Sequence, residues 1–277
     1  MSDNSESGST ARFVLLGVRG CLFLSGTASI VNQVVWQRGL TVFLGGSETI
    51  SSMIVVLVFM LGLGVGAAGM GARSRRLANP LRTFGWIELG LGLVNVSIAF
   101  LLGLDLSESV YEVQRVAVAT GVPQRAVYGI GALLLLLPPT VLLGATLPVA
   151  SEACQRQLGA TQTRLITTLF ALTTLGAVLG AFGSSFVLLP YFGQQVSLLG
   201  AAGFNAVAGG VLLGLARDRV VAPVTASPSA SQGMRPTRIE LLGFGLGFLS
   251  LAYEMLLLRA VSLIHGPLPI TFATTLC

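Results

Sequence analysis

The 277-residue sequence has a mean hydropathy of +0.84, and only 10% of its residues are charged, so it does not describe a soluble globular protein. Its net charge is +5, and all 16 basic residues are arginines. They lie mostly at the ends of apolar segments without interleaved aromatic residues, which argues against nucleic acid as a partner. Composition therefore predicts an all-α, polytopic transmembrane helix bundle whose main surroundings are the lipid bilayer.

In chain order, residues 1–11 are polar and Ser-rich, and we expect a disordered cytoplasmic tail there. The next apolar run, 13–36, predicts a first membrane span. It does not read as a secretory signal peptide, because Arg19 adjoins the only plausible cleavage site. A span needs roughly 20 mostly apolar residues, a criterion that predicts further spans at 50–71, 83–104, 126–149, 165–188, 196–215 and 239–262.

Two segments between the spans have a character of their own. Residues 106–119 are expected to form a short amphipathic surface helix. Residues 217–238 are rich in Pro, Ser and Ala, which predicts a flexible cytoplasmic linker. The expected domains are thus a six-span bundle at 12–216, the linker, and the first span of a second, truncated unit at 239–277.

The positions of the arginines predict the orientation. If the N-terminus is inside, the inside segments hold Arg12, four arginines within 73–82, Arg156, Arg164 and four within 217–238. The outside segments hold Arg38, Arg115 and Arg125, with Arg259 near an outer span end. This bias predicts a cytoplasmic N-terminus in a bacterial inner membrane.

A stretch near the start is repeated near the end. Residues 25–45 align without a gap on 246–266, so that Gly26 matches Gly247, Gln33 matches Glu254 and Arg38 matches Arg259. The match predicts that a second repeat begins after the first six spans. It also marks candidate polar sites of the repeat, namely Asn32, Gln33, Arg38, Tyr253, Glu254 and Arg259.

Glycine and proline patterns also invite interpretation. Gly64, Gly66 and Gly69 match a dinucleotide-binding pattern, but they lie within an apolar helix, where small residues favour close helix packing. The pairs Gly62/Gly66 and Gly176/Gly180 predict the same. Pro138 and Pro139 predict a kink or break in the fourth span, which would serve a substrate cavity or packing alone.

Charges inside the membrane are expensive and mark functional candidates. Arg19 and Glu88 lie at similar depths in the first and third predicted spans. One interpretation is an ion pair that clamps the two helices, which we favour; the other is a proton or cation site. The sequence predicts no catalytic residue, metal ligand set or cofactor: the single histidine, His265, has no converging partner, and the three cysteines are scattered.

Several motifs in order resemble the transmembrane region of the spermidine-synthase-like (fused MFS/spermidine synthase) membrane proteins. They are Ser25-Gly26 with 34–38 and Gly45, 62–66 leading into 71–73, 88–90, 144–148, 174–180 and 187–190. The family's Tyr-Glu before Val34 is here Asn32-Gln33, although Tyr253-Glu254 occurs in the second copy. No soluble Gly-rich nucleotide loop is present. The resemblance implies an MFS-like membrane architecture and a polyamine connection, and does not imply catalysis by this chain.

Three functions follow as hypotheses. The first is a transporter-like scaffold or accessory subunit that packs against other membrane proteins. The second is a transporter of a cation or small, polyamine-like metabolite. The third is the membrane part of a split or truncated aminopropyltransferase-like enzyme.

Overall fold

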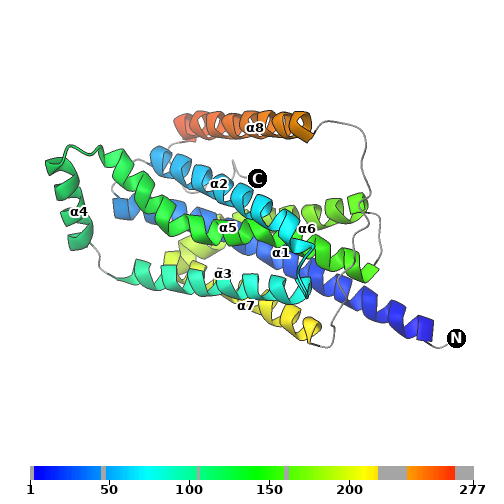
Figure 1. Cartoon of the computed structure of the whole chain (residues 1–277). Helices are drawn as coiled ribbons and strands as arrows, with labels where there is room; N and C mark the ends of the chain where they lie inside the picture. The colour runs from blue at the N-terminus through cyan, green and yellow to red at the C-terminus, as the bar shows by residue number, and fades with distance from the viewer. Residues whose placement is uncertain (1–2, 45–47, 105–106, 159–161, 218–235, 266–277) are drawn as a thin grey trace.

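The computed structural model describes residues 3–44, 48–104, 107–158, 162–217 and 236–265, and within these ranges every regular element is a helix (Figure 1). The elements are α1 (Asp3–Leu44), α2 (Glu48–Ser74), α3 (Pro80–Gly103), α4 (Ser107–Ala119), α5 (Gln124–Leu158), α6 (Gln162–Gly183), the π-helix η1 (Ser184–Phe192), α7 (Gly193–Ala216) and α8 (Pro236–His265). The predicted all-α class is confirmed for this part of the chain, as is the short helix expected at 106–119.

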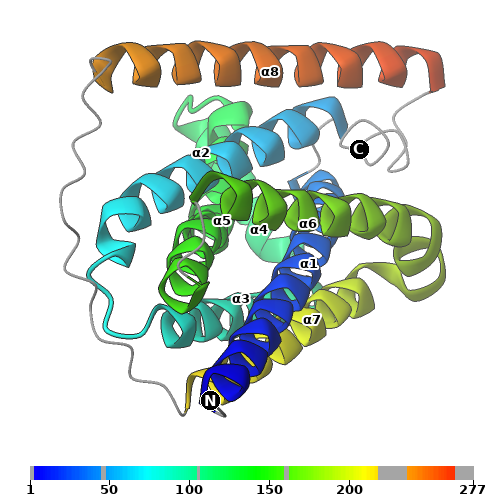
Figure 2. The same ribbon diagram turned by 90° about the vertical axis from the view of Figure 1, so that its right-hand side faces the viewer.

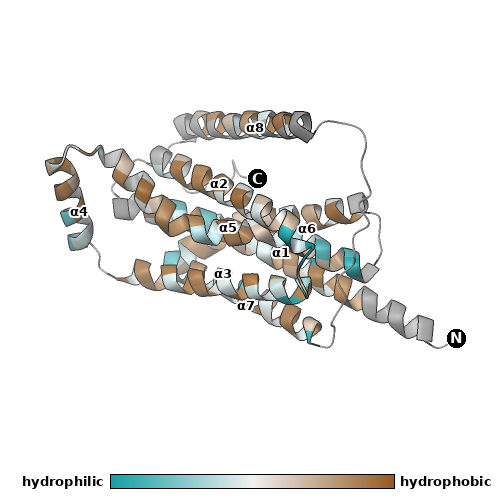
Figure 3. Ribbon diagram, viewed as in Figure 1, coloured by the Kyte–Doolittle hydropathy of each residue, from teal (hydrophilic) through white to brown (hydrophobic). Residues whose placement is uncertain are grey.

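Five stretches of the described residues are long and apolar enough to cross a membrane. They are Phe13–Thr41, Ser51–Ser74, Pro80–Gly103, Gly129–Arg156 and Leu165–Ala216. Helix α8 carries a shorter apolar stretch, Leu241–Ser250. Figure 3 shows these helices mostly in brown and white, with much of the teal near helix ends and in α4. The composition-based expectation of several membrane helices is thus supported by the structure.

The longest stretch, Leu165–Ala216, changes direction within its length. Helix α6 runs parallel to α1, since Gly176 meets Phe23 and Gly180 meets Thr27. Helix α7 runs antiparallel to α1, since Gly17 meets Leu215 whereas Gly39 approaches Gln194. The reversal occurs where η1 ends, at Gly193, whose φ of 75° is a backbone conformation that glycine adopts without strain.

Close helix crossings are made at glycines. A Cβ at Gly66 would overlap the Val141 carbonyl and lie 3.0 Å from the Ala145 nitrogen, so α2 and α5 touch backbone to backbone. A Cβ at Gly176 would overlap the Phe23 carbonyl and lie 3.1 Å from the Thr27 nitrogen, which joins α6 to α1 in the same way. The packing role predicted for Gly62/Gly66 and Gly176/Gly180 is confirmed, whereas Gly64 faces open space.

The pattern of the main helix–helix contacts is unchanged when each of α1, α2 and α3 is swapped with α5, α6 and α7, respectively. The α1–α6 contact then corresponds to α5–α2, α1–α7 corresponds to α5–α3, and α3–α7 maps onto itself. The two glycine crossings obey the same exchange: Gly26 packs on Thr173 as Gly144 packs on Leu63. The main contacts among the described helices are therefore symmetric under this exchange, a relation that the sequence comparison of 25–45 with 246–266 did not reveal.

Three expectations need correction. Helix α1 begins at Asp3, so residues 3–11, expected as a disordered tail, continue the first helix; elongating an existing helix is far easier than starting one. Helix α8 likewise begins at Pro236, inside the expected linker, while 218–235 lie outside the described residues. Helix α5 does not break at Pro138 and Pro139.

The proline pair is followed by a residue that ties the helix to its surroundings. The Thr140 hydroxyl donates to the Leu136 carbonyl at 2.8 Å, and Thr140 packs so closely on Gly62 of α2 that a Cβ there would overlap it. Neighbouring helices and Thr side chains commonly let a membrane helix continue through proline. Packing against α2 therefore outweighs the breaking tendency that the sequence indicated.

The turn between α2 and α3 is held by one arginine of α5. Arg156 Nη1 donates to the Leu77 carbonyl and Nη2 to the Arg75 carbonyl, each at 2.8 Å, while Nε pairs with Glu152 at 2.8 Å. The Arg156 side chain is only 2% exposed. This clamp fixes the polar end of the α2/α5 pair. At the edge of the bundle, α8 lies alongside α2 (Figure 2).

Candidate functional site

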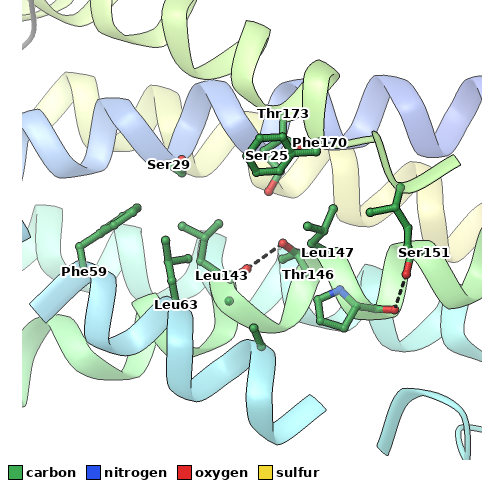
Figure 4. Close-up of a pocket in the computed structure, with 14 residues that line it drawn as sticks. Ser25, Ser29, Phe59, Leu63, Leu143, Thr146, Leu147, Ser151, Phe170 and Thr173 are labelled. Atoms are coloured by element: carbon green, nitrogen blue, oxygen red, sulfur yellow. Dashed lines mark hydrogen bonds between the residues drawn. The ribbon is translucent and has the colours of Figure 1, made fainter. Parts of the chain in front are cut away.

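A cavity of about 440 Å³ lies between α1, α2, α5 and α6. Its walls are mainly apolar, including Phe59, Leu63 and Phe170. Figure 4 shows Ser25, Phe170 and Thr173 on one side of it and Leu63, Leu143 and Leu147 on the other. The cavity thus separates the α1/α6 pair from the α2/α5 pair, between the two glycine crossings described above.

Five hydroxyl side chains line this apolar cavity, and four of them make hydrogen bonds to their own helix. Thr146 donates to Leu143 O at 2.7 Å, Thr173 to Leu169 O at 3.0 Å, Ser29 to Gly26 O at 3.1 Å and Ser151 to Pro148 O at 3.2 Å. Each hydroxyl proton is therefore used, while the oxygen lone pairs stay available as acceptors. Such walls suit a ligand that donates N–H or O–H groups.

The fifth hydroxyl, Ser25, connects the cavity to Glu88 of α3. Ser25 lines the cavity and also interacts with the Glu88 carboxylate, although the two groups do not meet the geometry of a hydrogen bond. Glu88 is fully buried, and neither of its oxygens has a hydrogen-bond partner among the protein groups. A carboxyl group therefore stands directly behind one wall of the cavity.

The expected ion pair between Arg19 and Glu88 is not formed. The ion pairs among the described residues join Arg115 to Glu112 and Arg156 to Glu152. Arg19 interacts electrostatically with Cys154 of α5, whereas Glu88 interacts with Cys21 of α1. The two charges have similar depth but point to different neighbours, because α7 packs against both α1 and α3 and shares their interface. The sequence shows that the two residues lie at similar depth, but similar depth does not establish that their side chains face each other.

The candidate polar residues of the repeat differ in their exposure to the surroundings. Asn32 and Gln33 are buried in α1, 4% and 1% exposed, and each has an atom without a hydrogen-bond partner. Arg38 is exposed near the end of α1, and Tyr253 is exposed on α8. The side chains of Glu254 and Arg259 lie outside the described residues. Among the described side chains, Tyr253 on the exposed surface of α8 does not share a site with the buried Asn32 and Gln33.

Sequence reasoning missed two buried amides, Asn95 of α3 and Asn205 of α7. They are 0% and 2% exposed, and both polar atoms of Asn95 and the oxygen of Asn205 lack partners. Leaving a buried polar group unpaired costs about 1–3 kcal/mol, against a total stability of about 5–15 kcal/mol for a typical domain. A usable signal was present: Asn95 follows Glu88 by seven residues and therefore shares its helix face.

No cluster of three or more His, Cys, Asp or Glu side chains capable of holding a metal ion occurs in the described ranges. The two cysteines described there, Cys21 and Cys154, are buried and unpaired with one another, and Cys21 donates to the Ala208 carbonyl at 3.5 Å. The chemistry that the site offers is therefore hydrogen bonding, apolar contact and one carboxyl group.

The comparisons with known proteins give one informative match. The chain is 33% identical over 210 residues to Polyamine aminopropyltransferase 2 of Streptomyces coelicolor. The aligned region covers 74% of this chain and 34% of that protein, so the chain spans about a third of the length of the curated relative. No family model matches the chain, and no solved structure matches it.

Proposed function

We propose that this chain is the membrane-embedded module of an aminopropyltransferase-like protein and that it binds an amine-bearing small molecule within the bilayer. The observation that carries the proposal is the hydroxyl-lined cavity of about 440 Å³ with the buried Glu88 carboxyl behind Ser25. The similarity to a polyamine aminopropyltransferase supports polyamines as the ligand class.

The chemistry of the cavity fits an alkylamine. The free lone pairs of Ser29, Thr146 and Thr173 accept N–H donors, and the Glu88 carboxyl group near Ser25, once ionised, attracts a protonated amine. The leucine and phenylalanine walls suit the methylene chain between two amino groups. A small set of polar groups in a mostly apolar pocket is the usual form of a small-molecule site.

A transporter-like architecture is part of the proposal. The exchange of α1–α2–α3 for α5–α6–α7 reverses the direction of each helix, as inverted three-helix repeats in MFS-type transporters do. The reversal at Gly193 supports two passes within Leu165–Ala216 and therefore six passes in this unit. Transport across a bacterial inner membrane, with the N-terminus in the cytoplasm, is the corresponding proposal for location.

A scaffold or accessory role remains the second candidate. It is favoured by the relative's length, because the matched region is about a third of a longer protein, and a membrane region can serve to anchor another domain or subunit. In that case the cavity would hold no specific ligand. The two candidates are separated by a binding measurement.

The test is equilibrium binding of radiolabelled spermidine to the full chain in lipid nanodiscs. Ala67 lines the cavity from α2, so Ala67→Phe fills part of it and should weaken binding at least tenfold. Val65→Phe is the matched control: Val65 lies on the same helix, is 51% exposed and does not line the cavity, so affinity should be unchanged. Absence of saturable binding by the native chain would overturn the amine-binding proposal and leave the scaffold role.

A further inference from the structure

A second group of polar side chains is buried between α1, α3 and α7, and of its members Glu88 borders on the cavity through Ser25. We call it the polar seam and define it by Asn32, Glu88, Asn95 and Asn205. Each is at most 4% exposed, and each has at least one side-chain nitrogen or oxygen without a hydrogen-bond partner among the protein groups. None of these four residues lines the amine-binding cavity.

Two contacts between the three helices bracket the seam residues along the bundle. At one end, Cys21 of α1 interacts with Glu88 and donates to Ala208 O of α7. At the other end, a Cβ at Gly39 of α1 would lie 3.3 Å from Leu102 of α3 and 3.6 Å from Gln194 of α7. Asn32 of α1, Asn95 of α3 and Asn205 of α7 lie between these two contacts, and Asn32 shares the face of α1 that carries Cys21 and Gly39.

The same faces of the helices carry the polar groups. Glu88, Gly92 and Asn95 follow one another at spacings of four and three residues and so lie on one face of α3. Asn205 of α7 packs against this face, since a Cβ at Gly92 would lie 3.6 Å from the Asn205 Cβ. The row on α3 therefore continues from the carboxyl group of Glu88 toward the end of the bundle at which α1 ends.

The mixture of unpartnered atoms indicates what fills the seam. Oxygens of Asn32, Asn95 and Asn205 lack hydrogen donors, and the Nδ2 of Asn95 and the Nε1 of nearby Trp36 lack acceptors. A bare metal cation would satisfy only the oxygens. Water satisfies both kinds of atom, and buried waters in proteins typically make about three hydrogen bonds each to such groups.

We propose that the polar seam is a water-filled proton site that extends from Glu88 toward the end of the bundle at which α1 ends. In the exchange step, the O–H bond of the Glu88 carboxyl group breaks as its proton passes to a seam water, and the reverse step restores it. No oxidant, reductant or further reactant takes part. A buried ionisable group joined to water by polar side chains is the usual construction of an intramembrane proton site.

Few other titratable groups face Glu88 from the helices packed against it. Helix α1 contributes Cys21, and its Arg19 instead interacts with Cys154 of α5. On α5 the remaining described charges, Glu152 and Arg156, pair with each other. Helix α7 contains no titratable residue. Glu88 is therefore the titratable group that would exchange protons with water in the polar seam.

The test is infrared spectroscopy of the full chain in nanodiscs, with no amine present, so its result is independent of the amine-binding proposal. We expect a protonated-carboxyl C=O band that Glu88→Gln removes, that declines as pH rises, and that shifts rapidly when H₂O is replaced by D₂O. Asn95→Leu and Asn205→Leu, on two different helices, should slow this deuterium exchange at least tenfold. Ser97→Leu, at an exposed position of α3, should leave it unchanged.

Three outcomes would overturn the proton site. One is a native chain with no carboxyl band that depends on Glu88 and pH. Another is a Glu88 carboxylate band that responds to sodium and not to pH, which would indicate a cation site. The third is deuterium exchange in both folded leucine variants, verified by gel filtration, that is as fast as in the native chain.

Discussion

At the scale of single residues, close contacts between the described helices are made at glycines, which have no side chain. Gly66 and Gly176 each lie against a carbonyl and an amide of a neighbouring helix, which are backbone atoms that cannot rotate away. Hydrocarbon surroundings give little hydrophobic driving force for helix association, so van der Waals contact at such positions carries the packing. A single methyl group is therefore enough to disturb the bundle.

Gly66→Ala should destabilise the protein by about 1–3 kcal/mol, because the new methyl group overlaps the Val141 carbonyl and forces α2 away from α5. Gly176→Ala should cost a similar amount, since its contacts with Phe23 and Thr27 are equivalent. Unfolding of the purified protein in detergent measures both.

Gly64→Ala is the matched control for these substitutions, because nothing lies within 4 Å of its Cβ position. It should leave stability unchanged or raise it by about 0.5–1 kcal/mol, the usual difference between glycine and alanine within a helix. Equal destabilisation by Gly64→Ala and Gly66→Ala would contradict the close crossing of α2 and α5.

At the scale of elements, the turn between α2 and α3 depends on a side chain from α5. Three of the arginines predicted to set orientation, Arg73, Arg75 and Arg76, lie in or beside this turn, and they are exposed. Arg156 is different: its side chain is buried, and its N–H groups donate to two carbonyls of the turn and to Glu152. One arginine thus closes the bundle end while its neighbours remain free to interact with water or lipid headgroups.

Arg156→Gln should loosen this turn, because a hydrogen bond from a charged group contributes about 1.5–3 kcal/mol. The expected result is faster tryptic cleavage after Arg75 and Arg76 in nanodiscs. Arg115→Gln provides the comparison, since both partners of the Arg115–Glu112 pair are more than half exposed and should add little stability. Unchanged cleavage in Arg156→Gln would show that the clamp is dispensable.

At the scale of the whole molecule, the orientation proposed from the arginines can be tested by chemistry on two exposed sites. Arg75, beside the α2–α3 turn, and Glu108, in α4, belong to opposite ends of α3. The positive-inside rule assigns the first to the cytoplasm and the second to the outside.

In a variant in which Cys277 is serine, Glu108→Cys should react with a membrane-impermeant maleimide on intact cells. Arg75→Cys should react only after the membrane is opened. Cys21 and Cys154 are buried and should stay unlabelled in folded protein. Labelling of Arg75→Cys on intact cells would reverse the proposed orientation.

The sequence correctly predicted the features that depend on periodicity and composition. It did not predict which side chains of different helices face each other. Apolar runs located the long helices, and glycines at a spacing of four predicted close packing at Gly66 and Gly176. The Arg19–Glu88 pair was expected from depth alone, but rotation about the helix axes points the two side chains elsewhere. Asn95 and Asn205 were not singled out, because a lone amide in an apolar run can be recognised as part of a polar group only when its neighbours on other helices are known.

The two glycine crossings also have a mechanical consequence. Within each crossed pair, α1/α6 or α2/α5, backbones touch and no side chain can yield, so each pair behaves as one stiff body. Between the pairs lie the cavity and the flexible side chains of Leu63, Leu147 and Phe170. We therefore expect the two crossed pairs to separate from one another more easily than either pair comes apart, a movement that would widen or narrow the cavity.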